Sequence, residues 1–147
     1  LDGSLGGALR SRIAAAFLEA WRSPLRRALE SSARFEAPAR LAELARGVDG
    51  IVQLGNCTGE GWFLTAEMVE LIRAGADGIV CLQPFACLPN HVTGKGMLKE
   101  LRRRHPEVPI APIDFDPGAS EVNQLNRLKL LLESARRRRG AAGQERP

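Results

Sequence analysis

The sequence predicts an α/β fold: a parallel sheet of three or four strands that alternates with helices, preceded by a helical segment. Short apolar runs at residues 50–54, 78–82 and 109–115 have the length and composition of buried strands. Helical patterns separate these runs, and glycines punctuate the connections. Strands that alternate with helices through short loops pair in parallel with right-handed crossovers.

The first elements along the chain are helices. Residues 8–33 carry large apolar side chains at helical spacing, and Pro24 predicts either a kink or the start of a second helix. Another helix fits residues 37–47, which end on Gly47. The first predicted strand follows this helix.

Three further helices connect or follow the predicted strands. The pattern predicts one over residues 65–75, with Thr65 as its N-cap, and one over residues 94–106. The last helix is predicted over residues 120–136, where leucines and a valine share one face.

By composition the chain divides into three parts. Residues 1–34 form a helical segment, residues 35–135 an α/β lobe, and residues 136–147 a disordered basic tail that opens with an arginine run. The chain of 147 residues begins with Leu1 rather than methionine, and the predicted sheet is small to stand alone. We therefore expect a fragment of a longer protein.

Composition restricts the partners of the chain. The net charge is +4, but the arginine run is confined to the tail, and the absence of tyrosine leaves few side chains to stack on bases. No apolar stretch is long enough to span a membrane. Three cysteines without a secretory signal indicate a reducing compartment. We expect a cytoplasmic protein that binds neither nucleic acid nor membranes.

Three loops follow the predicted strands, and the unusual residues of the chain lie in them. Their sequences are GNCTGEGW, PFACLPNHVTGKG and DFDPGAS. In parallel α/β sheets, ligands bind beyond the carboxyl ends of the strands. This coincidence is the strongest indication of function that the residues give.

The first loop is rich in glycine. Gly59 and Gly61 let the backbone approach a ligand, and the amides at the start of the next helix could hold an anion. The spacing matches neither common nucleotide-binding motif. A tight connection between strand and helix explains these glycines equally well.

The other two loops carry polar candidates for substrate or anion binding. His91 is either a ligand or proton donor, or a solvated loop residue. Lys95 lies between two glycines at a helix start, where it can meet an anion or simply face solvent. Asp114 and Asp116 at a strand end can hold a metal or a ribose hydroxyl, and Asp116 can equally cap the next helix.

The three cysteines are candidate metal ligands. Cys81 ends a strand and Cys87 lies in a loop between two prolines; their spacing is not that of a zinc ribbon. Cys81 is equally well explained as a buried strand residue, whereas Cys87 has no such packing reason. Soft thiolates gathered in a loop suit an iron–sulfur cluster or zinc, and Cys57 in the first loop is a further candidate.

Three blocks of the sequence resemble the 2-hydroxyacyl-CoA dehydratase family. They are GNCTGEGWFLTAEMVELI, GIVCLQPFACLPNHVTGKGMLKELRRRHP and IDFDPGASEVNQLNRLKLLL. The similarity is closest to the C-terminal dehydratase-like domain of large proteins related to the CoA-dehydratase activases. In the third block, a pattern of that family matches Asp114, Phe115, Asp116, Gln124, Leu125 and Arg127.

The resemblance implies a flavodoxin-like or Rossmann-like lobe in an ATP-driven electron-transfer system. In such systems an iron–sulfur ATPase passes one electron to a dehydratase with [4Fe–4S] clusters, and a ketyl radical on the acyl-CoA thioester lets the hydroxyl group leave. The resemblance also implies that cluster ligands come from more than one lobe, and Cys81 or Cys87 lies where one is expected. The implied partners are the activase ATPase domain, other dehydratase-like lobes and an acyl-CoA substrate.

Three functions remain open at this stage. In the first, Cys81, Cys87 and Cys57 contribute to a [4Fe–4S] cluster; in the second, the lobe has no cluster and docks onto the activase ATPase; an unrelated nucleotide-binding domain is third. The ATPase part is absent, so the chain holds no complete active site of such a lyase. A cluster requires the sulfurs of Cys81 and Cys87 within about 7 Å of each other on one side of the sheet edge. A Cys81 sealed in the core favours docking.

Overall fold

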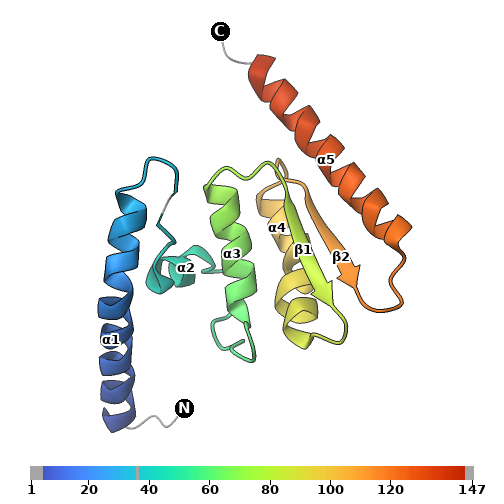
Figure 1. Cartoon of the computed structure of the whole chain (residues 1–147). Coiled ribbons are helices and arrows are strands. Elements are labelled where there is room, and N and C mark those ends of the chain that lie inside the picture. The colour runs from blue at the N-terminus through green and yellow to red at the C-terminus, as the bar shows by residue number, and fades with distance from the viewer. Residues whose placement is uncertain (1–4, 36, 145–147) are drawn as a thin grey trace. The chain divides into compact units, whose positions relative to one another are not determined.

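The computed structural model describes residues 5–35 and 37–144 and divides the chain into two compact units, residues 1–39 and 40–147. The first unit therefore extends slightly beyond the helical segment predicted for residues 1–34. The ends of that segment and of the predicted tail, residues 1–4 and 145–147, lie outside the described residues. Figure 1 labels the elements of both units.

The first unit consists of helix α1, Leu5–Glu30, and the turn that follows it. The predicted N-terminal helical segment is confirmed. The helix continues through Pro24, so no second helix begins there, although proline cannot donate a backbone hydrogen bond within the helix. None of the residues of α1 is buried. Neither α1 nor any other helix in the described part of the chain is long and apolar enough to cross a membrane.

The second unit alternates helices with strands. In chain order its elements are α2 Leu41–Gly47, α3 Trp62–Arg73, β1 Ile79–Pro84, the π-helical turn η1 Asn90–Gly94, the 3-10 turn η2 Lys95–Met97, α4 Leu98–Arg104, β2 Ile110–Phe115 and α5 Glu121–Gln144. The mixed helix and strand composition that the sequence predicts is confirmed.

Strands β1 and β2 form a parallel two-stranded sheet. Ile79 pairs with Ile110 at one end, and Pro84 pairs with Phe115 at the other. The backbone amide of Ile79 donates to the Pro109 carbonyl at 2.9 Å. The second and third predicted strands and their parallel pairing are therefore confirmed.

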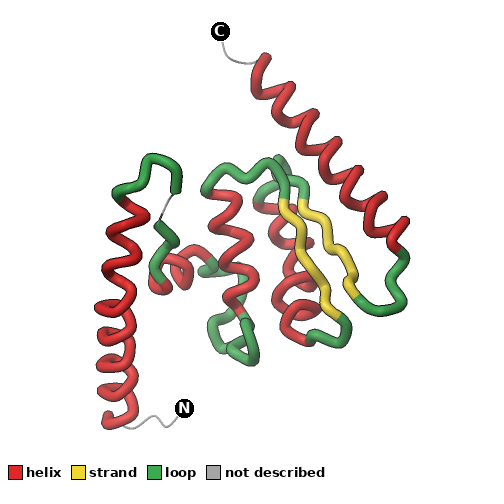
Figure 2. Tube along the Cα trace, in the orientation of Figure 1, coloured by secondary structure: helices red, strands yellow, loops and turns green. Residues whose placement is uncertain are grey.

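The strand predicted at residues 50–54 is absent, and the sheet of three or four strands is not seen among the described residues. Figure 2 shows instead a continuous loop between α2 and α3. The Val48 carbonyl accepts the amides of Ile51 at 2.9 Å and Val52 at 3.2 Å, which folds the backbone into a turn. Local turn bonds take the place of strand pairing in this segment.

The two faces of β1 differ in burial. Ile79, Cys81 and Gln83 are buried, whereas Val80 and Leu82 are exposed. This alternation is expected of a strand with one covered face. We name the face that bears Val80 and Leu82 the outer face of β1.

Helix α5 covers β2 and leaves β1 open. Ile113 of β2 is the register partner of Leu82 and points to the same side of the sheet, yet it is fully buried while Leu82 is 50% exposed. Leu131 of α5 belongs to the buried core, and Figure 1 shows α5 running beside β2. The outer face of β1 therefore has no covering helix among the described residues of the second unit.

Helix α5 extends further than predicted. The sequence predicts its end at residue 136 and a disordered tail beyond, but the described part of that tail, residues 136–144, continues the helix. Arg138 donates to the Ala76 carbonyl at 3.0 Å, and Arg139 forms an ion pair with Asp77 that lowers the pKa of the aspartate. The arginine run therefore attaches the helix to the segment before β1.

The start of α3 also differs from the prediction. Gly61 precedes the helix with φ 51° and ψ −132°, a conformation that only glycine adopts readily. A Cβ atom there would lie 2.0 Å from the carbonyl oxygen of Asn56. Thr65, the predicted N-cap, lies inside the helix, and its buried hydroxyl donates to the Thr93 carbonyl at 2.5 Å. This bond ties α3 to η1.

Replacing Gly61 by alanine is expected to lower the free energy of unfolding by at least about 2 kcal/mol, because the new Cβ is both strained and in contact with backbone. Urea unfolding measures the change. Gly55→Ala is the matched control, since a Cβ at Gly55 meets nothing within 4 Å. An equal loss in both variants would contradict the explanation.

Candidate functional site at the carboxyl edge of the sheet

The predicted site loops lie together at the carboxyl edge of the sheet. Two of them leave the ends of β1 and β2, and the glycine-rich loop reaches the same region, where a Cβ on Gly59 would lie 2.8 Å from the ring of Pro89. A pocket of about 200 Å³ separates the two loops. It is lined by Gly55, Asn56, Thr58, Gly61, Leu88, Pro89, Val92 and Thr93. The structure thus brings the first and second predicted loops together.

Cys81 lies on the inner face of β1 and is 9% exposed. Its Sγ accepts a hydrogen bond from Nε2 of Gln83 at 3.1 Å. Burial raises the pKa of the Cys81 thiol, against smaller lowering effects of this hydrogen bond and of the Lys95 charge. A protonated, enclosed thiol has the character of a packing residue rather than that of a metal ligand.

Cys87 is partly buried in the loop after β1. Its thiol donates to Oδ1 of Asn90 at 2.9 Å, and Nδ2 of Asn90 donates to the Leu82 carbonyl at 2.8 Å. Asn90 therefore links the thiol to the edge of β1. Cys87 can be released from this arrangement by the loss of one side-chain hydrogen bond.

The described residues do not by themselves fit an iron–sulfur cluster. The three thiols predicted as ligands lie in different environments. Cys57 is exposed, the thiol of Cys87 is hydrogen-bonded to Asn90, and Cys81 is in the core. Within residues 5–35 and 37–144, no three His, Cys, Asp or Glu residues gather into a metal-binding group. Since a cluster takes about four ligands, any cluster here needs donors from elsewhere.

The glycine-rich loop uses its own polar groups. The amide of Trp62 at the start of α3 donates to the Asn56 carbonyl at 2.7 Å, and the amide of Phe63 donates to Glu60 at 3.1 Å. These amides are therefore engaged, and Gly59 and Gly61, both at positive φ, serve the turn. The local geometry agrees with a tight connection that leads into α3 rather than with an anion-binding site.

The polar candidates in the other two loops are also engaged or solvated. Lys95 pairs with Asp114 at 3.5 Å, and both side chains are nearly half exposed. Oδ1 of Asp116 accepts the amide of Gly118 at 2.8 Å, which forms the turn before α5. His91 lies exposed in η1. Asp114 and Asp116 line a pocket of about 230 Å³ with the start of α5, but Asp114 pairs with Lys95 and Asp116 serves the turn.

Side chains seal the outer edge of β2. The carbonyls of Ile110, Pro112 and Asp114 point away from β1, and each accepts a side-chain hydrogen bond. The donors are Arg102 at 2.6 Å, Arg127 at 2.8 Å and Gln124 at 2.8 Å, respectively. Pro112 in addition has no N–H to offer. Capped carbonyls and a proline both block the addition of a further strand.

The sequence contained a signal for this sealed edge. Proline within an apolar strand pattern is typical of edge strands, and Pro112 marks β2 in this way. In the sequence, Gln124 and Arg127 stand out only through the family pattern, and Arg102 carries no signal of a role. In the structure all three bind backbone carbonyls of one strand.

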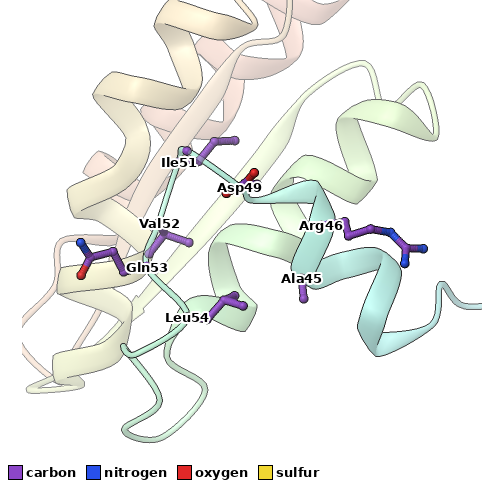
Figure 3. Close-up of a pocket in the computed structure, with 8 residues that line it drawn as sticks. Ala45, Arg46, Asp49, Ile51, Val52, Gln53 and Leu54 are labelled. Atoms are coloured by element: carbon purple, nitrogen blue, oxygen red, sulfur yellow. The ribbon is translucent and has the colours of Figure 1, made fainter.

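A second region of interest is an open pocket of about 950 Å³ beside the loop that follows α2 (Figure 3). Its lining comprises Ala45, Arg46, Asp49, Gly50, Ile51, Val52, Gln53 and Leu54. None of the predicted site residues lies in it. The segment predicted as the first strand therefore borders open space.

Comparisons with protein-family models, with curated proteins and with solved structures found no match to the chain.

The three thiols are expected to differ in reactivity in the order Cys57, Cys87, Cys81. Exposure favours Cys57, while the raised pKa of Cys81 keeps its thiolate fraction low at neutral pH. Alkylation of the native chain followed by mass spectrometry gives the three rates, and alkylation in denaturant provides the control in which the rates converge. Native Cys81 reacting as fast as Cys57 would contradict the buried environment.

Proposed function

We propose that the chain is a cytoplasmic docking lobe of a 2-hydroxyacyl-CoA dehydratase and activase system, and that the activase ATPase domain covers the outer face of β1. The acyl-CoA chemistry belongs to the assembled protein, because the chain alone holds no complete active site. The family comes from the resemblance of the three sequence blocks. The exposed outer face of β1 supports the docking role.

One observation supports docking over the other functions: α5 covers the outer side of β2 but not that of β1. Val80 is 37% exposed and Leu82 is 50% exposed. Phe115, at the end of β2, is the register partner of Pro84 on the same face and is 48% exposed. Several exposed apolar side chains on one sheet face are typical of an interaction surface.

The buried state of Cys81 supports the same choice. The cluster function requires Cys81 and Cys87 to point into a common space, and the core position of Cys81 removes it from that role. A lobe without a complete ligand set can still bind its partner through the exposed face. We therefore place docking first.

Leu82→Asp is expected to weaken binding of the full chain to the activase ATPase domain at least about tenfold, because a charge replaces an apolar contact. Isothermal titration calorimetry measures the affinity. Leu71→Asp, on α3, is the matched control, since Leu71 is 48% exposed and Leu82 is 50% exposed. Equal affinities of both variants and wild type, or binding only to another dehydratase-like lobe, would contradict this proposal.

A shared cluster is the second candidate, and one contact favours it. The loop of Cys57 meets the loop of Cys87 where Gly59 approaches Pro89, so two of the three thiols occupy neighbouring loops. In this function the two thiols provide part of a [4Fe–4S] ligand set, and another lobe provides the rest.

This candidate predicts iron and sulfide in the anaerobically purified chain together with its partner, and a loss of at least about half of the iron in Cys87→Ala. Cys81→Ala serves as the control and retains the iron, because Cys81 belongs to the core. Colorimetric assays measure both elements. Iron content that is unchanged in Cys87→Ala, or absent from wild type, would rule out a cluster at this loop.

A further inference from the structure

The two edges of the sheet are not equivalent. The amides of Ile79 and Phe85 donate to the carbonyls of Pro109 and Phe115. The backbone N–H and C=O groups of the odd-numbered residues of β1 therefore point toward β2, and those of the even-numbered residues point to the opposite edge of the strand. On this outer edge Asn90 and Gln83 occupy the Leu82 carbonyl, and Pro84 has no N–H. The N–H and C=O of Val80 and the N–H of Leu82 find no partner among the described residues.

We propose that the outer edge of β1 is a strand-addition site whose occupant is the chain's own segment Gly50–Leu54. The segment adds as a third parallel strand, and the structure shows it in the unpaired position. Unpaired backbone groups on an edge strand are a template for such pairing.

The segment already runs in the direction that this pairing needs. At its start, Arg104 at the end of α4 donates to the Gly50 carbonyl, which places Gly50 near the amino end of the sheet. After its end, the loop reaches Pro89 at the carboxyl edge through Gly59. The chain between these two points therefore runs from the amino end to the carboxyl end, as a parallel strand does.

The connection to β1 also has the required form. Parallel neighbours need a crossover of a dozen or more residues, usually a helix. Helix α3, Trp62–Arg73, lies between the segment and β1 and provides it. The segment is apolar and β-branched, with a length of about five residues that is normal for a strand.

The unpaired position is held mostly by local bonds. The Val48 carbonyl accepts the amides of Ile51 and Val52, the Gln53 carbonyl accepts the backbone amide and Nδ2 of Asn56, and Arg104 donates to the Gly50 carbonyl. Leu54 is 49% exposed. The pocket of about 950 Å³ in Figure 3 lies beside it and leaves room for the segment to move. Pairing with β1 replaces the turn bonds by ladder bonds and uses the free groups of Val80 and Leu82.

Amide hydrogen exchange on the full chain tests the proposal. The amides of Val80 and Leu82 are expected to exchange at least about tenfold more slowly than unprotected peptide, although no backbone partner faces them in the unpaired position. Val80→Pro removes the outward N–H and is expected to release residues 51–54 from protection. Val80→Ala keeps the N–H and is the matched control. Protection of Cys81, within the ladder to β2, shows that a variant is folded.

A second variant changes the added segment instead of β1. Val52→Pro changes the segment and leaves β1 intact, so it is expected to release the Val80 and Leu82 amides while Cys81 stays protected. Fast exchange of Val80 and Leu82 in wild type, or protection that survives Val52→Pro, would overturn the proposal. Protection that rises with protein concentration would also overturn it, because a second copy would then supply the strand. These outcomes are independent of partner binding to the outer face.

Discussion

In a two-stranded sheet both strands are edge strands, so each presents a row of backbone donors and acceptors that need partners. On β2 the problem is solved by side chains from the two helices that flank the strand in sequence. Arg102 comes from α4, and Gln124 and Arg127 come from α5. The same bonds therefore seal the edge and fix both helices against the strand, which explains why Ile113 is fully buried.

The side chains that bind the edge of β2 do not reach β1, whose outer face and outer edge stay partly uncovered. Among the described residues of the second unit, no helix covers Val80 and Leu82 on its outer face, and half of its outer edge has no partner. Asn90 and Pro84 protect only the carboxyl half. An apolar sheet face packs against apolar side chains, whereas a strand edge pairs with another backbone, so the two surfaces suit different binding partners. In our proposals the activase ATPase domain covers the face, and the chain's own segment pairs with the edge.

The predictable parts of this fold were those with local signals. Strands β1 and β2 were found because each is a short apolar run between breakers, and the helices showed apolar periodicity. Residues 50–54 carry the same apolar signal, but the turn at Val48 and Gly50, the latter at φ 68°, decides their conformation. The sequence does not predict which face of the sheet Cys81 lies on. Its neighbours on β1 are apolar on both faces, so no alternation of polar and apolar residues distinguishes the buried face from the exposed one. Arg102 and its carbonyl partner become neighbours only through folding.

The cysteines connect the two proposed functions. Ligation by Cys81 would require a buried thiol of raised pKa to lose its proton and its hydrogen bond to Gln83 and to turn out of the core. Cys87 has to give up only its bond to Asn90, and Cys57 is already exposed. The chain can thus offer a cluster at most two accessible thiolates, fewer than the roughly four ligands that a cluster takes. The remaining donors must come from a partner, so both proposed functions need the chain to bind another domain or lobe.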